Sequence, residues 1–182
     1  TMAFDAHSGP LPRIAARMKE IIAAKEIPGA VTLIATPQGV VHLQAIGDAD
    51  LKGRKLQSDS IFWIASMTKP ITGTAILMLQ ETKKLSVDDP VSKYIPEMAN
   101  LKTPSGKPAN LTLKHLMTHT SGLPEATPEE LKAAKKLGDL IPAHLNKPMQ
   151  FEPGSQWKYC QSGINTLGRI IEVVSGKPYE VF

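Results

Sequence analysis

The chain has 182 residues, of which 42% are hydrophobic and 21% are charged. This composition is typical of a globular domain that can build a core, and it does not favour a disordered chain. The formal net charge is +4, and the lysines are spread along the chain. A nucleic-acid-binding surface needs a clustered basic stripe, so this pattern does not favour nucleic-acid binding. A single cysteine, Cys160, excludes an intrachain disulfide, and no apolar run approaches the length of a transmembrane helix.

The first ten residues contain no apolar stretch like that of a signal peptide. Two localisations therefore remain open. The protein is periplasmic or secreted if a signal peptide was removed, and cytoplasmic if Met2 is the native start.

The N-terminal third favours one helix followed by a β-hairpin. A helical pattern opens at Pro10 and stops at Pro28 and Gly29. Residues 30–35 and 40–47 are β-rich runs on either side of the turn sequence 36–39, and residues 48–60 predict a loop. The apolar face expected on the helix consists of Leu11, Ile14, Met18, Ile21 and Ile22.

The next segment changes to helical character. Residues 71–84 are apolar around nearly the whole circumference of a helix at their start, which predicts a buried helix. Asp89 is the expected N-cap of a short helix within residues 86–98, with Pro90 at the first helical position.

The C-terminal third predicts further helices. Thr112 caps a short helix expected to end near Gly122, and one or two short helices are expected in residues 125–150. Residues 163–178 form an amphipathic helix that ends at Gly176. Its inward side chains are predicted to be Ile164, Leu167, Ile170, Ile171 and Val174.

This order of elements predicts an α+β fold. Residues 1–60 would supply an N-terminal helix and hairpin, and residues 61–182 a mainly helical part. Because a two-stranded hairpin is marginal alone, we expect it to join an antiparallel sheet whose other strands lie outside this chain.

The stretch "FWIASMTKPITG" places Ser66 and Lys69 three residues apart. On a helix these positions share a face, so the lysine amine can reach the serine hydroxyl. Serine needs a base to become a nucleophile, and lysine serves as one when burial or a helix N-terminus lowers its pKa. Pro70 lacks an amide hydrogen and therefore places Ser66 at a helix entrance, where its backbone N–H is a candidate oxyanion donor. The simpler interpretation is a capping serine followed by an exposed lysine.

Three longer sequence blocks favour the nucleophile over the capping serine. "WIASMTKPITGTAILMLQETKKLSVDDPVSKYIPE", "LTLKHLMTHTSGLP" and "FEPGSQWKYCQSGINTLGRIIEVVSGKPYEVF" together resemble the serine β-lactamase and penicillin-binding-protein superfamily. They are most similar to its class C-like branch, which also holds family VIII esterases. The resemblance runs from about residue 10 to the end.

The resemblance implies roles for four residues. Ser66 would form the acyl-enzyme and Lys69 would accept its proton. Tyr159 matches the tyrosine of the family's Tyr-x-Asn motif, which shares the proton with the lysine and later activates water. Gln161 stands where the family usually has asparagine, so its extra methylene puts substrate positioning in question.

The block His119 to Leu123 is interpreted as loop and pocket wall, with Ser121 and Leu123 expected to contact substrate. His115 and His119 are four residues apart, a metal-ligand spacing on a helix, but no third ligand is evident, so neither a metal nor another cofactor is expected. Cys160 is expected to be a small buried filler.

The family's third motif, Lys-Thr-Gly or His-x-Gly, does not follow Gln161. We therefore expect the chain to correspond to the N-terminal part of such an enzyme, with the C-terminal sheet segment absent or supplied as a second chain. The favoured function is a serine hydrolase acting on an ester, β-lactam or D-amino-acid peptide. The alternative is a non-catalytic relative that binds a partner chain or ligand.

Overall fold

The structure, a computed structural model, describes residues 11–182. The predictions that concern Met2 and Pro10 lie outside the described residues. Two compact units divide the chain between Trp63 and Ile64. The predicted α+β class is confirmed: the described chain is mainly helical and has one antiparallel two-stranded sheet.

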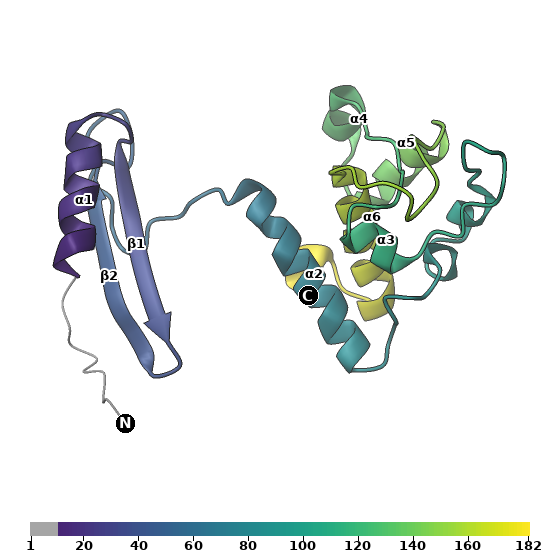
Figure 1. The fold of residues 1–182 in the computed structure, drawn as a ribbon, viewed down its shortest axis with the longest axis horizontal. Helices are drawn as coiled ribbons and strands as arrows, with labels where there is room; N and C mark the ends of the chain where they lie inside the picture. Colours follow the sequence, from purple (N-terminus) through teal and green to yellow (C-terminus); the bar gives the residue numbers. More distant parts are fainter. Residues whose placement is uncertain (1–10) are drawn as a thin grey trace. The chain divides into compact units, whose positions relative to one another are not determined.

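The first unit consists of one helix and one hairpin. Helix α1 (Pro12–Ala23) lies along the hairpin formed by β1 (Gly29–Thr36) and β2 (Gly39–Gly47), as Figure 1 shows. Gly29 pairs with Gly47 at one end, and Thr36 pairs with Gly39 across the predicted turn. The hairpin prediction is therefore confirmed. The apolar face of α1 is only partly covered, because no residue of this helix is fully buried.

The second unit holds the remaining elements. Its α-helices are α2 (Thr68–Glu81), α3 (Leu113–Met117), α4 (Pro128–Ala133), α5 (Ile141–Leu145) and α6 (Gln161–Ser175). Its 3-10 turns are η1 (Ala65–Met67), η2 (Val91–Lys93), η3 (Pro96–Asn100), η4 (Leu137–Leu140) and η5 (Tyr179–Val181).

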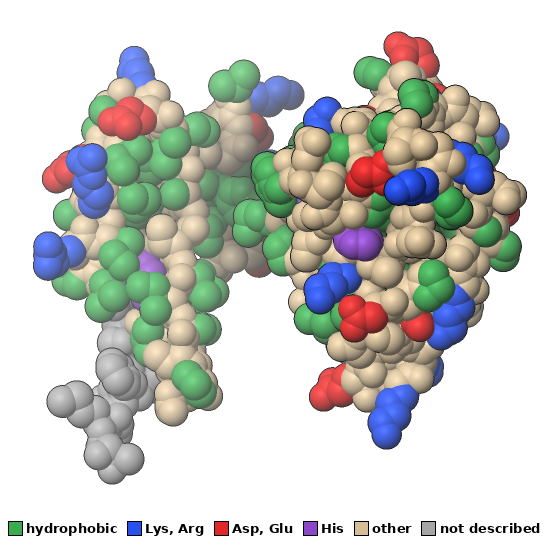
Figure 2. Space-filling view, turned by 45° about the vertical axis from the view of Figure 1, so that its right-hand side comes forward, with side chains coloured by type: hydrophobic (Ala, Val, Ile, Leu, Met, Phe, Trp, Pro, Cys, Tyr) green, Lys and Arg blue, Asp and Glu red, His purple; other side chains and the backbone are tan. Residues whose placement is uncertain are grey.

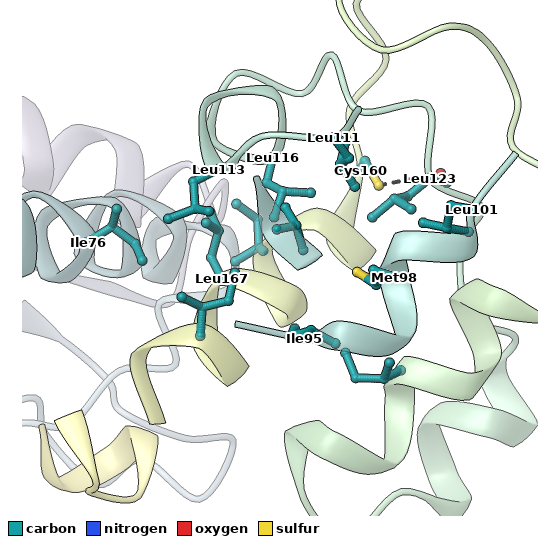
Figure 3. Packing of buried hydrophobic residues seen from close by; sticks show 14 of the residues in the cluster. Ile76, Ile95, Met98, Leu101, Leu111, Leu113, Leu116, Leu123, Cys160 and Leu167 are labelled. Carbon is teal, nitrogen blue, oxygen red and sulfur yellow. Dashed lines mark hydrogen bonds between the residues drawn. The ribbon is translucent and has the colours of Figure 1, made fainter. Parts of the chain in front are cut away.

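The core of the second unit is built around α6, which packs against α2 and α3. Of the predicted inward side chains, Ile164, Leu167, Ile170 and Ile171 are buried, and Val174 is partly buried against the same cluster. Gly176 ends the helix with a left-handed φ of 71°. Figure 3 shows Leu167 in the same cluster as side chains from α2, α3 and η3. Full burial of each such side chain contributes roughly 1.5–3 kcal/mol, so α6 holds the unit together.

Several sequence predictions for this unit are wrong, in whole or in part. Helix α2 is not buried all round: Thr72, Ile76 and Leu79 are buried, whereas Ile71 and Met78 are exposed. Its packing against α6 covers a single face, because a helix presents only one side to one neighbour.

Asp89 is not a helix N-cap. Its carboxylate instead accepts hydrogen bonds from the backbone N–H of Ser86, the amine of Lys93 and the hydroxyl of Tyr94. Two separate 3-10 turns, η2 and η3, replace the single short helix that was expected there.

The predicted cap at Thr112 is confirmed, but the helix that it begins ends at Met117 and not near Gly122. Gly122 has a φ of 73° and lies so close to Phe151 that an added Cβ would stand 2.2 Å from the Phe151 carbonyl oxygen. A glycine is required there by close approach of the backbone as well as by conformation.

No helix within residues 11–182 combines the length and the apolar character that crossing a membrane requires.

Candidate active site

Ser66 and Lys69 lie at the entrance to α2. Ser66 is in the turn η1 and Lys69 in the first helical turn, and the Lys69 amine donates a hydrogen bond to Ser66 Oγ at 3.1 Å. Pro70 follows in the same turn, where a missing amide hydrogen leaves no intrahelical bond unmade. The structure therefore places the predicted pair in contact.

The backbone just before Ser66 is unusual. Ala65 has a φ of 46°, a left-handed conformation that non-glycine residues adopt at some cost. Helix α2 also has no side-chain N-cap, and Ser66 is exposed. The strained turn thus presents the Ser66 hydroxyl outward and does not use it as a cap.

Tyr159 and Gln161, which lie in the C-terminal part of the chain, contact Ser66 and Lys69. The Tyr159 hydroxyl donates to Ser66 Oγ at 2.8 Å, and Gln161 Oε1 accepts from the Lys69 amine at 2.5 Å. The Lys69 nitrogen also lies 4.8 Å from the centroid of the Tyr159 ring. The four residues that the resemblance singles out therefore form one connected network, in which Lys69 and Tyr159 contact the Ser66 hydroxyl and Gln161 contacts Lys69.

The charge of Lys69 changes the acidity of its neighbour. Hydrogen bonding to Lys69, and then to Ser66, lowers the pKa of Tyr159 from its ordinary value. Cationic and hydrogen-bonding partners favour the phenolate form of a tyrosine. Tyr159 is 48% exposed, so solvent moderates this effect.

Two residues that sequence reasoning did not find hold this arrangement. The Glu125 carboxylate accepts from the backbone N–H groups of Gln161 at 2.6 Å and Ser162 at 2.9 Å, which caps α6. Asn165 Oδ1 accepts from Gln161 Nε2 at 3.0 Å, which turns the oxygen of the Gln161 amide toward Lys69. The i,i+4 spacing of Gln161 and Asn165 is a usable sequence signal, whereas nothing local indicates the pairing of Glu125.

Ser121 and Leu123, which were expected to contact substrate, lie elsewhere. Their side chains are only 1% and 2% exposed, and neither lines the cavity at Ser66. Leu123 belongs to the core cluster, and Ser121 Oγ accepts from the backbone N–H of Leu123 (Figure 3 shows Leu123 beside Cys160). The segment is buried because Gly122 packs against the backbone of Phe151.

A cavity of about 570 Å³ opens at the site. Its polar side is formed by Ser66, Lys69, Tyr159 and His119, and its apolar lining includes Met117, Ile164 and Leu167. A largely apolar cavity with a few convergent polar groups is the usual form of a small-molecule site.

The two histidines of the proposed metal spacing make other contacts. His115 Nδ1 bonds to Thr112 in the cap of α3, and His119 Nδ1 accepts from the backbone N–H of Cys160. Among residues 11–182, no three or more His, Cys, Asp or Glu side chains group so that they could hold a metal ion. Cys160 is buried, as expected, and burial raises the pKa of its thiol.

Comparison with known proteins points the same way as the geometry. The family model described as Beta-lactamase matches residues 14–182. The chain is 32% identical over 181 residues to the esterase EstB of Burkholderia gladioli, in a match covering 91% of this chain and 46% of that protein.

Two solved structures are similar in fold. One is EstCE1, a hydrolase with promiscuous acyltransferase activity, at a TM-score of 0.82 and 26% identity, covering 92% of this chain and 48% of that one. The other is the octameric penicillin-binding protein homologue from Pyrococcus abyssi, at a TM-score of 0.74 and 30% identity, covering 93% and 40%. The chain spans about half the length of these relatives, or less.

Proposed function

Since the chain belongs to the Beta-lactamase family, we propose that it carries the acylation site of a serine hydrolase, with Ser66 as nucleophile. The observation that supports this most strongly is that both Lys69 and Tyr159 contact Ser66 Oγ. The substrate class is an ester or an amide, including β-lactams and D-amino-acid peptides.

The proposed reaction begins from the form of the Lys69–Tyr159 pair that has lost one proton to solvent, which makes the pair a base. Ser66 Oγ attacks the substrate carbonyl carbon while its proton passes to that base. The bond to the leaving group then breaks, and the alcohol or amine that departs takes up the proton. Tyr159, whose pKa Lys69 lowers, is suited to accept the proton and to activate the water that later releases the acyl group.

Positioning falls to the amide of Gln161. Its bond to Lys69 holds the amine at Ser66, and Asn165 fixes the direction of the amide. The backbone N–H of Ser66, at the entrance to α2, is the proposed donor to the oxyanion that forms. The apolar lining of the cavity suits an acyl chain or ring of moderate size.

Covalent labelling tests this proposal. The purified chain would be treated with a fluorescent fluorophosphonate and with a fluorescent penicillin, and the adduct mapped by mass spectrometry. We expect labelling at Ser66, loss of labelling in Ser66→Ala and Lys69→Ala, and unchanged labelling in Ser155→Ala, which removes an exposed serine near Tyr159. Labelling that survives Ser66→Ala would contradict the assignment.

The alternative function, a non-catalytic ligand-binding relative, is distinguished by the same experiment. A folded chain that neither probe labels would favour it. Where labelling occurs, hydrolysis of p-nitrophenyl butyrate against nitrocefin separates an esterase from a β-lactamase.

A further inference from the structure

Three consecutive residues of the segment that carries Tyr159 all contact His119. The backbone N–H of Lys158 donates to the His119 carbonyl oxygen at 2.9 Å, and the backbone N–H of Cys160 donates to His119 Nδ1 at 3.2 Å. Between them, the Tyr159 ring stacks on the imidazole, with 4.7 Å between centroids and 31° between planes. His119 therefore contacts the backbone on both sides of Tyr159 and also the face of the Tyr159 ring.

The backbone of His119 is shaped for this contact. Its φ is 59°, a left-handed conformation that a histidine adopts only when its surroundings stabilise it. The residue lies just beyond α3, where the Thr120 N–H donates to the His115 carbonyl oxygen. Trp157 also meets the imidazole edge-on, at 6.1 Å between centroids.

We propose that His119 is a positioning residue that holds the Tyr159 hydroxyl at Ser66, and that it does so only as a neutral imidazole. This inference rests on the proposed function, since it concerns the rate at which Ser66 is acylated. The chemistry follows from Nδ1: a nitrogen that accepts a bond from an amide carries no hydrogen, so the proton of the neutral ring is on Nε2. A second proton would have to go onto Nδ1, and it would remove the acceptor that holds Cys160.

The groups facing the imidazole set the pH at which this occurs. Burial, and then the positive charge of Lys69 on α2, lower the pKa of His119, while the charge of Glu125 acts in the opposite direction. The Tyr159 side chain, whose pKa is itself lowered, stacks on the ring, whereas the Cys160 thiol, whose pKa is raised, points to the Leu123 carbonyl oxygen. His119 thus stays neutral at neutral pH and takes up its proton only in acid, below its ordinary value of about 6.5.

Two substitutions separate the contacts of His119. His119→Asn keeps an acceptor oxygen near the place of Nδ1 and tolerates a left-handed φ, but it neither titrates nor stacks. His119→Phe keeps an aromatic face and loses the acceptor. His115→Asn is the matched control, because His115 caps α3 and does not contact Tyr159.

The main experiment measures the acylation rate of Ser66 by p-nitrophenyl butyrate between about pH 4 and pH 9, in the folded full chain. We expect the wild-type rate to fall in acid more steeply than one titrating group allows, because the Lys69–Tyr159 base and His119 both take up protons. We expect His119→Asn to lose the part of the fall that His119 causes and to keep the part that belongs to the Lys69–Tyr159 base. Because a misplacement of about 1 Å costs on the order of 100-fold, His119→Phe should lower the maximal rate roughly 10- to 100-fold with little change in KM. His115→Asn should keep both the rate and the pH profile.

A second measurement does not depend on catalysis. In protein with ¹³C-labelled tyrosine, the ring signals of Tyr159, assigned with Tyr159→Phe, should shift as His119 titrates, and this shift should be absent in His119→Asn. If Ser66 is never acylated but the shift is seen, the proposed function fails and the positioning role stands. If His119→Asn keeps the full steepness of the wild-type acid limb, or if the Tyr159 shift persists in that variant, the role assigned to His119 is wrong.

Discussion

The two units of the chain are built on different amounts of interior. Among residues 11–63, only His42 and Leu56 are buried, whereas the second unit has a continuous apolar cluster drawn from α2, α3, α6 and the turns between them. Figure 2 shows apolar side chains spread over the outer surface of the helix and hairpin. The hairpin is specified by its turn and strand pattern, but the second unit is specified by packing.

Each unit also buries one histidine, and the two histidines differ in whether their ring nitrogens have hydrogen-bond partners. His42 has partners at both ring nitrogens: the backbone N–H of Leu11 at 2.8 Å and the Thr32 hydroxyl at 2.7 Å. His144 is fully buried in α5, and neither of its ring nitrogens has a hydrogen-bond partner in the described structure. The interior of the first unit is thus joined by polar contacts, and that of the second tolerates an unpaired polar ring.

The largest expected effect is a cavity in the second unit. Leu113 on α3 is fully buried, so Leu113→Ala should lower the free energy of unfolding by about 3 kcal/mol. Urea denaturation followed by fluorescence of Trp157 in a Trp63→Phe background would report this unit alone, because Trp63 is 94% exposed and its replacement disturbs little. A loss below about 1 kcal/mol would mean that the cluster does not determine stability.

The next effect is the pH dependence caused by His144. Burial lowers the pKa of its imidazole to about 4, from about 6.5 in an unfolded chain. Since the unfolded chain takes up the proton first, the free energy of unfolding should fall as pH drops from about 6.5 to about 4, by roughly 3 kcal/mol in total. His144→Leu should flatten this dependence in urea titrations at several pH values.

His42→Leu provides the contrast for that experiment. At neutral pH it should destabilise the first unit, because the Leu11 N–H and the Thr32 hydroxyl lose their partner. A His144→Leu chain that retains the full acid sensitivity would show that other groups are responsible.

Sequence patterns predicted the parts whose causes are local. The turn at 36–39, the cap at Thr112 and the apolar face of α6 each depend on residues a few positions apart, and each is present. The exposure of α2 was not predictable in this way, because the composition of a helix does not say how many of its faces have a neighbour.

The same distinction between local and long-range causes applies to the residues of the candidate active site. Ser66 and Lys69 are three residues apart where η1 leads into α2, so spacing alone indicates their contact. The roles of Tyr159 and Gln161 could be predicted only from the family resemblance. The contacts of Glu125 and His119 could be found only in the structure, because they join residues about forty positions apart. Ser121 and Leu123 were misplaced because a sequence motif does not distinguish the wall of a cavity from the core behind it.

A smaller effect is expected at the cap of α6. Glu125→Ala leaves the N–H groups of Gln161 and Ser162 without their acceptor and should cost about 1 kcal/mol. Because Gln161 begins the helix and bonds to Lys69, the acylation rate should fall as well. Glu129→Ala removes an equal charge from the exposed first turn of α4 and should change neither quantity. Equal effects from the two variants would indicate a general charge effect and no cap.

The smallest effect is expected on the hairpin, and it tests the comparison directly. Leu33 on β1 is 57% exposed and pairs across the sheet with Leu43, so Leu33→Ala opens no cavity and removes one cross-strand contact. Such contacts contribute about 0.5 kcal/mol, well below the loss expected at Leu113. Far-UV circular dichroism during urea unfolding would measure it, with Leu43→Ala and the double variant giving the coupling between the two side chains. A loss at Leu33 as large as that at Leu113 would mean that this face of the hairpin is covered in solution, since only a buried leucine carries that much free energy.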